Sequence, residues 1–193
     1  MKKFFAAMMF ALIFFGGNFV EAAAPFTAEQ SEKIISMTAE ISSATEKNLP
    51  VDEMTFRRKF NDFIINFILE LNAGNDAAEM ERLLTINDTN ISVREEGSVF
   101  MKNFFDRIAI VGISDGGNFR ALNLFATQLN SRDDALINAL ILQAFVKGIT
   151  PDFDSTSLLR ASKKNPTAPV IRDGVRYYIS RDENLNIVTA VAD

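Results

Sequence analysis

Hydrophobic residues follow a helical period in the first half of the chain. Between residues 28 and 47 they recur at spacings of three and four behind a Thr-x-x-Gln capping box, which predicts an amphipathic helix. A stronger stripe of Phe, Ile and Leu over 56–71 predicts a second helix, which Thr55 is placed to cap. A short helical segment is also predicted over 77–84.

The period changes to that of strands from about residue 89. Alternation over 91–94, a turn at 95–97 and apolar segments over 99–105, 108–113 and 119–125 predict a meander of three or four antiparallel strands. The glycine pair before the last of these segments can take positive φ, as a tight hairpin requires. This part of the chain is therefore predicted to form one group of adjacent antiparallel strands.

A nearly uninterrupted apolar helix is predicted over 132–147. Ser131 can cap it, Asp134 completes a capping box and Gly148 is placed to end it. Because this helix is apolar on almost every side, it must be covered on several sides. We therefore expect it to be the central core helix.

The C-terminal part predicts a short helix and a second group of strands. Asp154 can cap a helix over 155–163, and an Asp-Gly turn joins strands over 170–172 and 175–180. A last strand follows over 185–192. The hairpin register places Val170, Val175, Tyr177 and Ile179 on one face, and Ile171, Arg176 and Tyr178 on the other.

Together these elements predict an α+β fold with N-terminal helices. An antiparallel sheet of about five to seven strands, in two groups, would pack around the central apolar helix. Residues 51–193 would form a single globular domain, and residues 23–50 an N-terminal helix and linker. The helix over 28–47 could pack on that domain or form a loosely docked arm.

The N-terminus has the order of a secretory signal peptide over residues 1–22. Met1-Lys2-Lys3 precedes a twelve-residue apolar run over 4–15, and small residues follow at 22–24. Cleavage after Ala22 is favoured, within a window of 22–24. A membrane span needs about 20 apolar residues, so a permanent anchor is the less favoured alternative. The pattern predicts a secreted or periplasmic protein that meets a membrane only during export.

Composition excludes several chemistries among the 193 residues. The chain has no Cys and no His, so it cannot form a Ser-His-Asp triad, a Cys-His nucleophile, an ordinary zinc site or an iron–sulfur cluster. We predict no cofactor, no metal site and no catalytic residue. The net charge is −5, and basic clusters are short, as at Lys163-Lys164, which suits a solvated helix end. This balance argues against a nucleic-acid partner.

The strands over 108–113 and 119–125 are apolar on both faces, and one helical layer covers only one face of a sheet. The second cover could be the helix over 28–47, a second copy of the protein, or an apolar ligand or peptide on the sheet face.

Function is predicted only by class. The favoured hypothesis is a non-catalytic binding or protein-interaction domain of the cell envelope. The alternative is a cell-wall carbohydrate hydrolase that uses a carboxylate pair drawn from Glu95, Glu96, Asp115, Asp152 and Asp154. Each of these acids also has a turn or helix-cap position, which favours the binding hypothesis.

Overall fold

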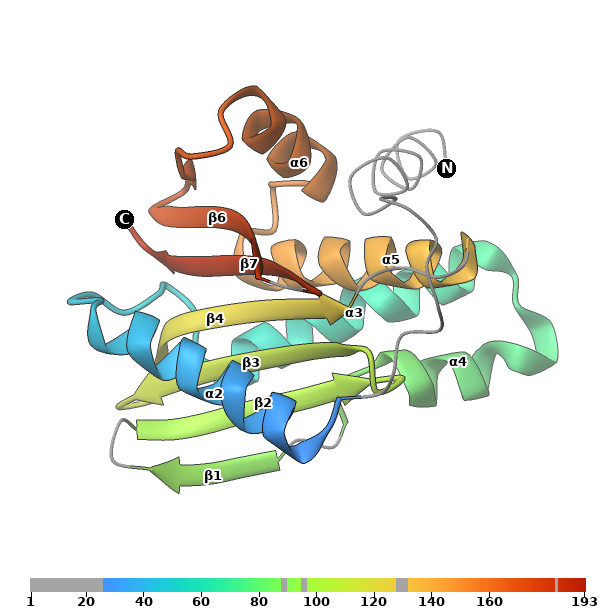
Figure 1. Cartoon of the computed structure of the whole chain (residues 1–193). Helices are drawn as coiled ribbons and strands as arrows, with labels where there is room; N and C mark the ends of the chain where they lie inside the picture. The colour runs from blue at the N-terminus through green and yellow to red at the C-terminus, as the bar shows by residue number, and fades with distance from the viewer. Residues whose placement is uncertain (1–25, 88–89, 95–96, 128–131, 183) are drawn as a thin grey trace.

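One seven-stranded antiparallel sheet forms the middle layer of the protein (Figure 1). The computed structural model describes residues 26–87, 90–94, 97–127, 132–182 and 184–193. The strand order is β1-β2-β3-β4-β7-β6-β5, so the two predicted groups of strands join where β4 pairs with β7. The strands are β1 (Asn90–Arg94), β2 (Gly97–Phe104), β3 (Ile108–Asp115), β4 (Asn118–Thr127), β5 (Val170–Arg172), β6 (Val175–Asp182) and β7 (Leu185–Ala192). The predicted α+β class is confirmed.

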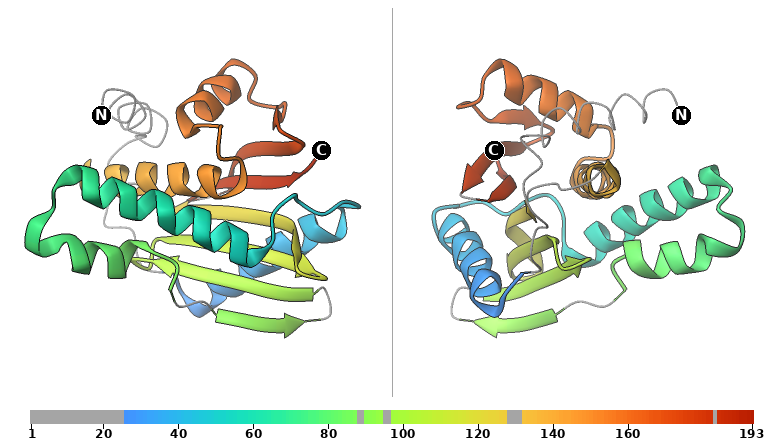
Figure 2. Two further views of the ribbon diagram at one scale, coloured as in Figure 1. Left: turned by 180° about the vertical axis from the view of Figure 1, so that it is seen from behind. Right: turned by 45° about the vertical axis from the view of Figure 1, so that its right-hand side comes forward.

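Helices lie on both faces of this sheet (Figure 2). Helices α3 and α5 cover one face, here called the inner face, and α2 crosses the opposite, outer face. The helices are α2 (Ala28–Ser43), α3 (Glu53–Leu71), the 3-10 turn η1 (Gly74–Asp76), α4 (Ala77–Leu84), α5 (Arg132–Ile149) and α6 (Ser155–Lys164).

The outer face of β3 and β4 is covered by α2. Ile34 and Ile35 of this helix are buried in one cluster with Val111 and Phe125 of the sheet. The predicted Thr27 capping box is present, and the helix ends at Ser43, four residues before the expected end. The second face of the apolar strands is therefore shielded by the chain itself where α2 crosses it.

Phenylalanines connect the two inner helices to the sheet. Phe56 of α3 meets Phe145 of α5, Phe100 of β2 and Phe119 of β4 edge-on, with ring centroids 6.0–6.2 Å apart. Phe60 stacks on Phe104 of β2 at 5.8 Å. The predicted Phe stripe of the second helix thus faces the core.

The first turn of α3 differs from the prediction. The helix begins at Glu53, and its cap is Asp52 rather than Thr55. The Asp52 carboxylate accepts hydrogen bonds from the main-chain N–H of Thr55 at 2.7 Å and from its hydroxyl at 2.9 Å. These bonds to Thr55 hold the pKa of Asp52 below its usual value. Thr55 is therefore the donor in the cap.

Gly148 was expected to end α5, but it does not. The helix continues to Ile149, and a Cβ atom at Gly148 would lie 2.7 Å from two ring carbons of Phe56. The glycine therefore permits the close packing of α5 on α3. The predicted cap Ser131 lies outside the described residues, and Asp134 pairs with Arg107 at 3.0 Å.

The predicted register of the C-terminal hairpin is confirmed. Val170 pairs with Tyr177, and Ile171 pairs with Arg176. Asp173 and Gly174 both have positive φ, at 50° and 75°, as the two-residue turn requires. This register places Tyr177 on the inner face and Arg176 on the outer face.

Tyr177 is fully buried on the inner face, and its hydroxyl lies 2.6 Å from that of Thr150. Burial raises the pKa of Tyr177 above its usual value. Above pH 10 the unfolded chain therefore loses a proton that the folded protein keeps. The free energy of unfolding should fall as pH rises there, with a slope of up to about 1.4 kcal/mol per pH unit.

Tyr177→Phe should remove this alkaline slope. Urea denaturation at several pH values between 9 and 11 measures it. Tyr178→Phe is the matched control, because its side chain lies at the surface. An unchanged slope in Tyr177→Phe would contradict the assignment.

Candidate functional site

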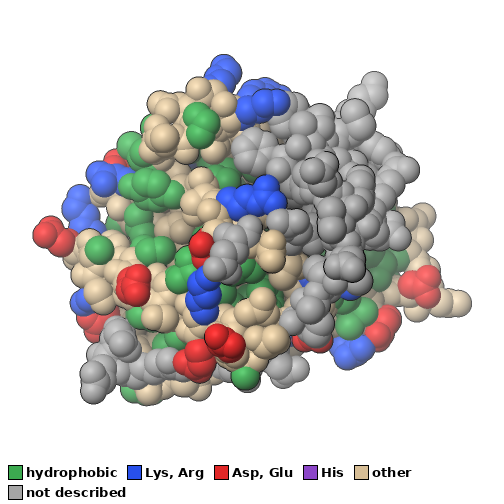
Figure 3. All heavy atoms as spheres, in the orientation of Figure 1, with side chains coloured by type: hydrophobic (Ala, Val, Ile, Leu, Met, Phe, Trp, Pro, Cys, Tyr) green, Lys and Arg blue, Asp and Glu red, His purple; other side chains and the backbone are tan. Residues whose placement is uncertain are grey.

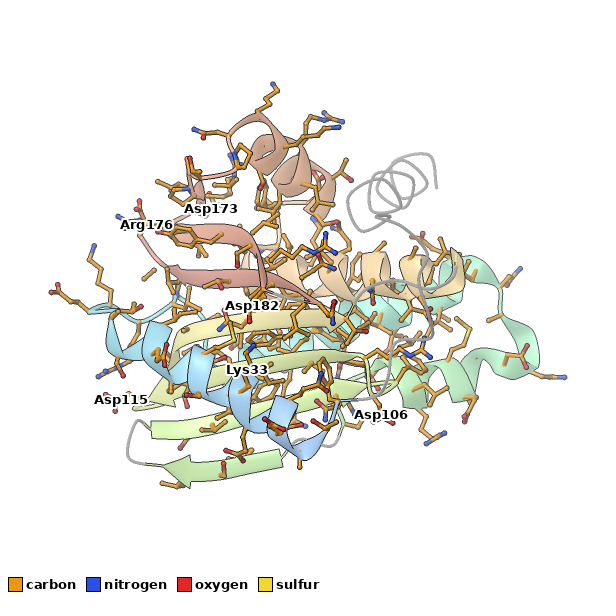
Figure 4. The ribbon with its side chains drawn as sticks, in the orientation of Figure 1. Lys33, Asp106, Asp115, Asp173, Arg176 and Asp182 are labelled. Carbon is orange, nitrogen blue, oxygen red and sulfur yellow. The ribbon has the colours of Figure 1, made fainter. Side chains whose placement is uncertain are left out.

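The acidic residues proposed for a hydrolase do not form a shared site in the described part of the chain. Asp115 lies exposed at the end of β3, where it pairs with Arg120 of the same hairpin (Figure 4). Glu95 and Glu96 lie outside the described residues. The ion pair of Asp115 is local and links the two strands beside the β3–β4 turn.

The other two candidate acids follow α5. The Asp154 carboxylate caps α6 by accepting bonds from the N–H and hydroxyl of Ser157, at 2.8 and 2.9 Å. Asp152 is exposed in the loop before it. The capping role expected for Asp154 is confirmed, and this geometry uses its carboxylate for structure.

A hollow lies on the outer face, between the C-terminal end of α2 and strands β6 and β7. This outer groove has a volume of about 710 Å³ and is open to solvent. Its lining includes Ile41, Lys47, Arg176, Tyr178, Thr189 and Val191. It exists because α2 crosses β3 and β4 and leaves the outer side of β6 uncovered.

An apolar strip runs along the outer groove. Ile41 of α2 and Val191 of β7 face it, and the half-exposed ring of Tyr178 continues the strip on β6. Figure 3 shows hydrophobic side chains gathered on this part of the molecule, with charged side chains around them. The strip offers a surface for one or two apolar side chains.

Asp193 closes one end of the groove. Its carboxylate accepts a hydrogen bond from Arg176, and its main-chain oxygen accepts one from Lys47 Nζ at 2.8 Å. The bond to Asp193 raises the pKa of Arg176, so the guanidinium stays charged. Two cations thus meet at Asp193 at this end of the groove; Arg176 is labelled in Figure 4.

Hydroxyl groups line the sheet side of the groove. Thr189 and Ser180 both face it, and Thr189 is paired in register with Tyr178 on one side and with Asn123 on the other. They can donate to or accept from a bound polar group.

A buried polar link positions α2 beside the groove. Asn123 Nδ2 donates to Thr38 Oγ1 at 3.0 Å, and that hydroxyl donates to the Ile34 carbonyl at 2.8 Å. Asn123 Oδ1 is buried without a hydrogen-bond partner among the described residues. A buried polar pair has few alternative partners, so this link fixes where α2 sits along the sheet.

The sequence did not identify the groove residues as a site. Lys47 and Asp193 lie 146 positions apart, and Arg176 and Tyr178 have the pattern of an ordinary half-exposed strand. The available signal was the mixed face of the C-terminal hairpin, which carries a charge, an aromatic ring and an apolar residue side by side.

Comparisons with protein-family models, curated proteins and solved structures find no match to this chain. Within the described ranges, no group of three or more His, Cys, Asp and Glu residues could hold a metal ion. No helix in the same ranges is long and apolar enough to cross a membrane. The outer groove is therefore the candidate functional site.

Proposed function

We propose that this is an exported, non-catalytic binding protein of the cell envelope, whose outer groove holds a short peptide. The observation that carries the proposal is the groove itself, which combines an apolar strip, hydroxyl groups and a charged end. Its volume of about 710 Å³ lies within the range of about 300–1,000 Å³ found for small-ligand sites.

A peptide suits this groove better than a purely apolar molecule. The ring of Tyr178 and the side chain of Val191 provide contact for an apolar side chain. The hydroxyls of Ser180 and Thr189 can pair with main-chain amides. Arg176 can bind a carboxylate, because its planar guanidinium presents several donors.

The carboxylates in and near the groove support binding rather than hydrolysis. Two acidic residues line the groove: Asp193, whose carboxylate is engaged by Arg176, and the exposed Glu46. The earlier candidates Asp115 and Asp154 serve a turn and a helix cap. Acid–base cleavage of a glycosidic bond needs two carboxyl groups about 5–10 Å apart that flank the substrate. We therefore advance no hydrolase proposal.

Export is part of this proposal and rests on the N-terminal pattern of residues 1–22. Native mass spectrometry of the full gene product, purified from its own envelope, tests export and binding together. We expect a mature chain that begins at Ala23 and carries a bound peptide. An intact N-terminus would refute export, and a mature chain of bare mass would refute the bound ligand.

Substitution of Arg176 tests the groove directly. We expect Arg176→Ala to weaken peptide binding about fivefold to tenfold, because it removes a charge-assisted hydrogen-bond donor. Nuclear magnetic resonance titration with a mixture of short peptides measures binding and should shift signals of groove residues. Arg172→Ala is the matched control, since Arg172 lies in the same hairpin outside the groove and pairs with Asp173.

Equal weakening by both variants, or shifts that lie away from the groove, would contradict this assignment. The absence of shifts with every peptide would also contradict it.

A further inference from the structure

A second hollow lies between the last turn of α6 and the distal half of the β6–β7 hairpin. This α6 pocket has a volume of about 300 Å³. Ile179 and Val188, which face the inner side of the sheet, give it an apolar side. Its polar side is formed by Ser162, Lys163, Arg181 and Asn186.

Ser162 is the most informative residue of the α6 pocket. It is only 5% exposed and it lines the pocket, so its hydroxyl can reach a group held there. Two other serines of α6 are satisfied, since Ser155 bonds to Gln143 and Ser157 to Asp154. Ser162 therefore offers the pocket a hydroxyl that can donate a hydrogen bond to a bound polar group or accept one from it.

The charged side chains described in the lining of the α6 pocket are both positive. Lys163 comes from α6 and Arg181 from β6, and neither forms an ion pair within the described ranges. Among the described residues, the lining contains no acidic side chain, although the whole chain carries a net charge of −5. The neighbouring carboxylate of Asp182 is taken by Lys33 of α2 at 2.8 Å (Figure 4).

We propose that the α6 pocket binds a small amphiphile with one anionic group, a carboxylate or a phosphate. The anionic group would lie between Lys163 and Arg181 and accept a hydrogen bond from Ser162. The apolar part would lie on Ile179 and Val188. The volume is at the lower end of small-ligand sites, which fits a single short chain rather than a two-chain lipid.

This site is separate from the outer groove, although Ser180 lines both hollows. The sequence pattern predicts a solvated helix end at Lys163-Lys164. The fold changes that interpretation for Lys163 alone, because it places Arg181 and a buried hydroxyl at the same pocket. Lys164, one residue further on, does not line the pocket.

Isothermal titration calorimetry on the purified full gene product tests the proposal with four probes below their micelle concentrations. Decanoate and decyl phosphate supply the two anionic groups on one chain length. Decanol lacks the charge, and inorganic phosphate lacks the chain. We expect one or both anionic amphiphiles to bind at least tenfold more tightly than decanol or inorganic phosphate, and the tighter one identifies the headgroup.

Two variants and a neighbouring control locate the site. Lys163→Gln and Arg181→Gln should each weaken binding of the preferred amphiphile about fivefold to twentyfold, because each removes one charge-assisted donor. Lys164→Gln should change the affinity less than twofold, since it removes the same charge from the same helix turn outside the pocket. Circular dichroism of all three confirms that the fold is kept.

Several results would overturn the proposal. Equal binding of decanol would show that the pocket does not recognise an anionic group. Equal binding of inorganic phosphate would show that the apolar chain contributes nothing. A loss of affinity in Lys164→Gln as large as in Lys163→Gln would show general charge attraction rather than a site. Failure of both anionic amphiphiles to bind would also refute it and would leave the peptide proposal for the outer groove untouched.

Discussion

Phe56→Ala is expected to lower the free energy of unfolding by about 3–5 kcal/mol, which is the range for a fully buried Phe replaced by Ala. The ring of Phe56 is buried and meets Phe60, Phe100, Phe119 and Phe145, at centroid distances of 5.9–6.2 Å. It also lies against Gly148, whose missing side chain makes room for it. Because these contacts come from α3, α5 and two strands, one truncation loosens the whole inner layer.

Urea denaturation followed by circular dichroism measures this loss. Leu69→Ala is the matched control on the same helix, because Leu69 is 68% exposed. That variant should change the free energy of unfolding by less than about 0.5 kcal/mol. A loss at Phe56 no larger than the loss at Leu69 would mean that α3 does not pack on the sheet as described.

The sequence predicted those parts of the fold that depend on local periodicity. The Phe stripe over 56–71 has the spacing of one helix face, and that face is buried. The register of the β5–β6 hairpin was predictable from the Asp173-Gly174 turn, because a one-residue slip would place the apolar face of the hairpin in water. The start of α3 was predicted wrongly: the pattern assigned the cap to Thr55, and the structure uses Asp52, three residues earlier.

The sequence predicted that something must cover the outer face of the sheet, but it did not show which segment or molecule does so. Two-sided apolar strands require a second layer, and the weak amphipathicity of residues 28–47 did not single out this helix. The hydrogen bond between Thr38 and Asn123 joins positions 85 residues apart. Periodicity carries no information about such a pair.

The candidate sites could not be predicted from the sequence for the same reason. The outer groove depends on Lys47 and Arg176 meeting at Asp193. The α6 pocket depends on Arg181 lying beside Ser162, although their local patterns show only a strand and a helix end. The acids singled out from the sequence were chosen for residue type, and the fold uses Asp115 and Asp154 locally.

Gly112→Ala is expected to destabilise the protein by about 1–3 kcal/mol, although Ala is usually the more favourable residue in a strand. Gly112 lies in β3 between Phe100 of β2 and Leu122 of β4. A Cβ atom there would overlap the ring of Phe119 and would lie 2.6 Å from Leu122 Cδ1. Both neighbours are fully buried, so the added methyl has no free space to occupy.

A control and a second substitution separate this packing effect from a general effect on the hairpin. Gly116→Asn changes the β3–β4 turn at a φ of +65°, which Asn tolerates, and an added Cβ there has no atom within 4 Å. It should change the free energy of unfolding by less than about 0.5 kcal/mol. Phe119→Leu replaces the ring that the new methyl would meet with a smaller side chain. Gly112→Ala should therefore lower the free energy of unfolding by less in that background.

Urea denaturation of both single variants, the double variant and the wild type gives the coupling between the two sites. We expect an interaction energy of about 0.5–3 kcal/mol in favour of the double variant, as is found for residues in direct contact. Strict additivity would mean that Gly112 does not approach Phe119. A neutral Gly112→Ala would mean that β3 and β4 pack more loosely on the inner helices than these distances require.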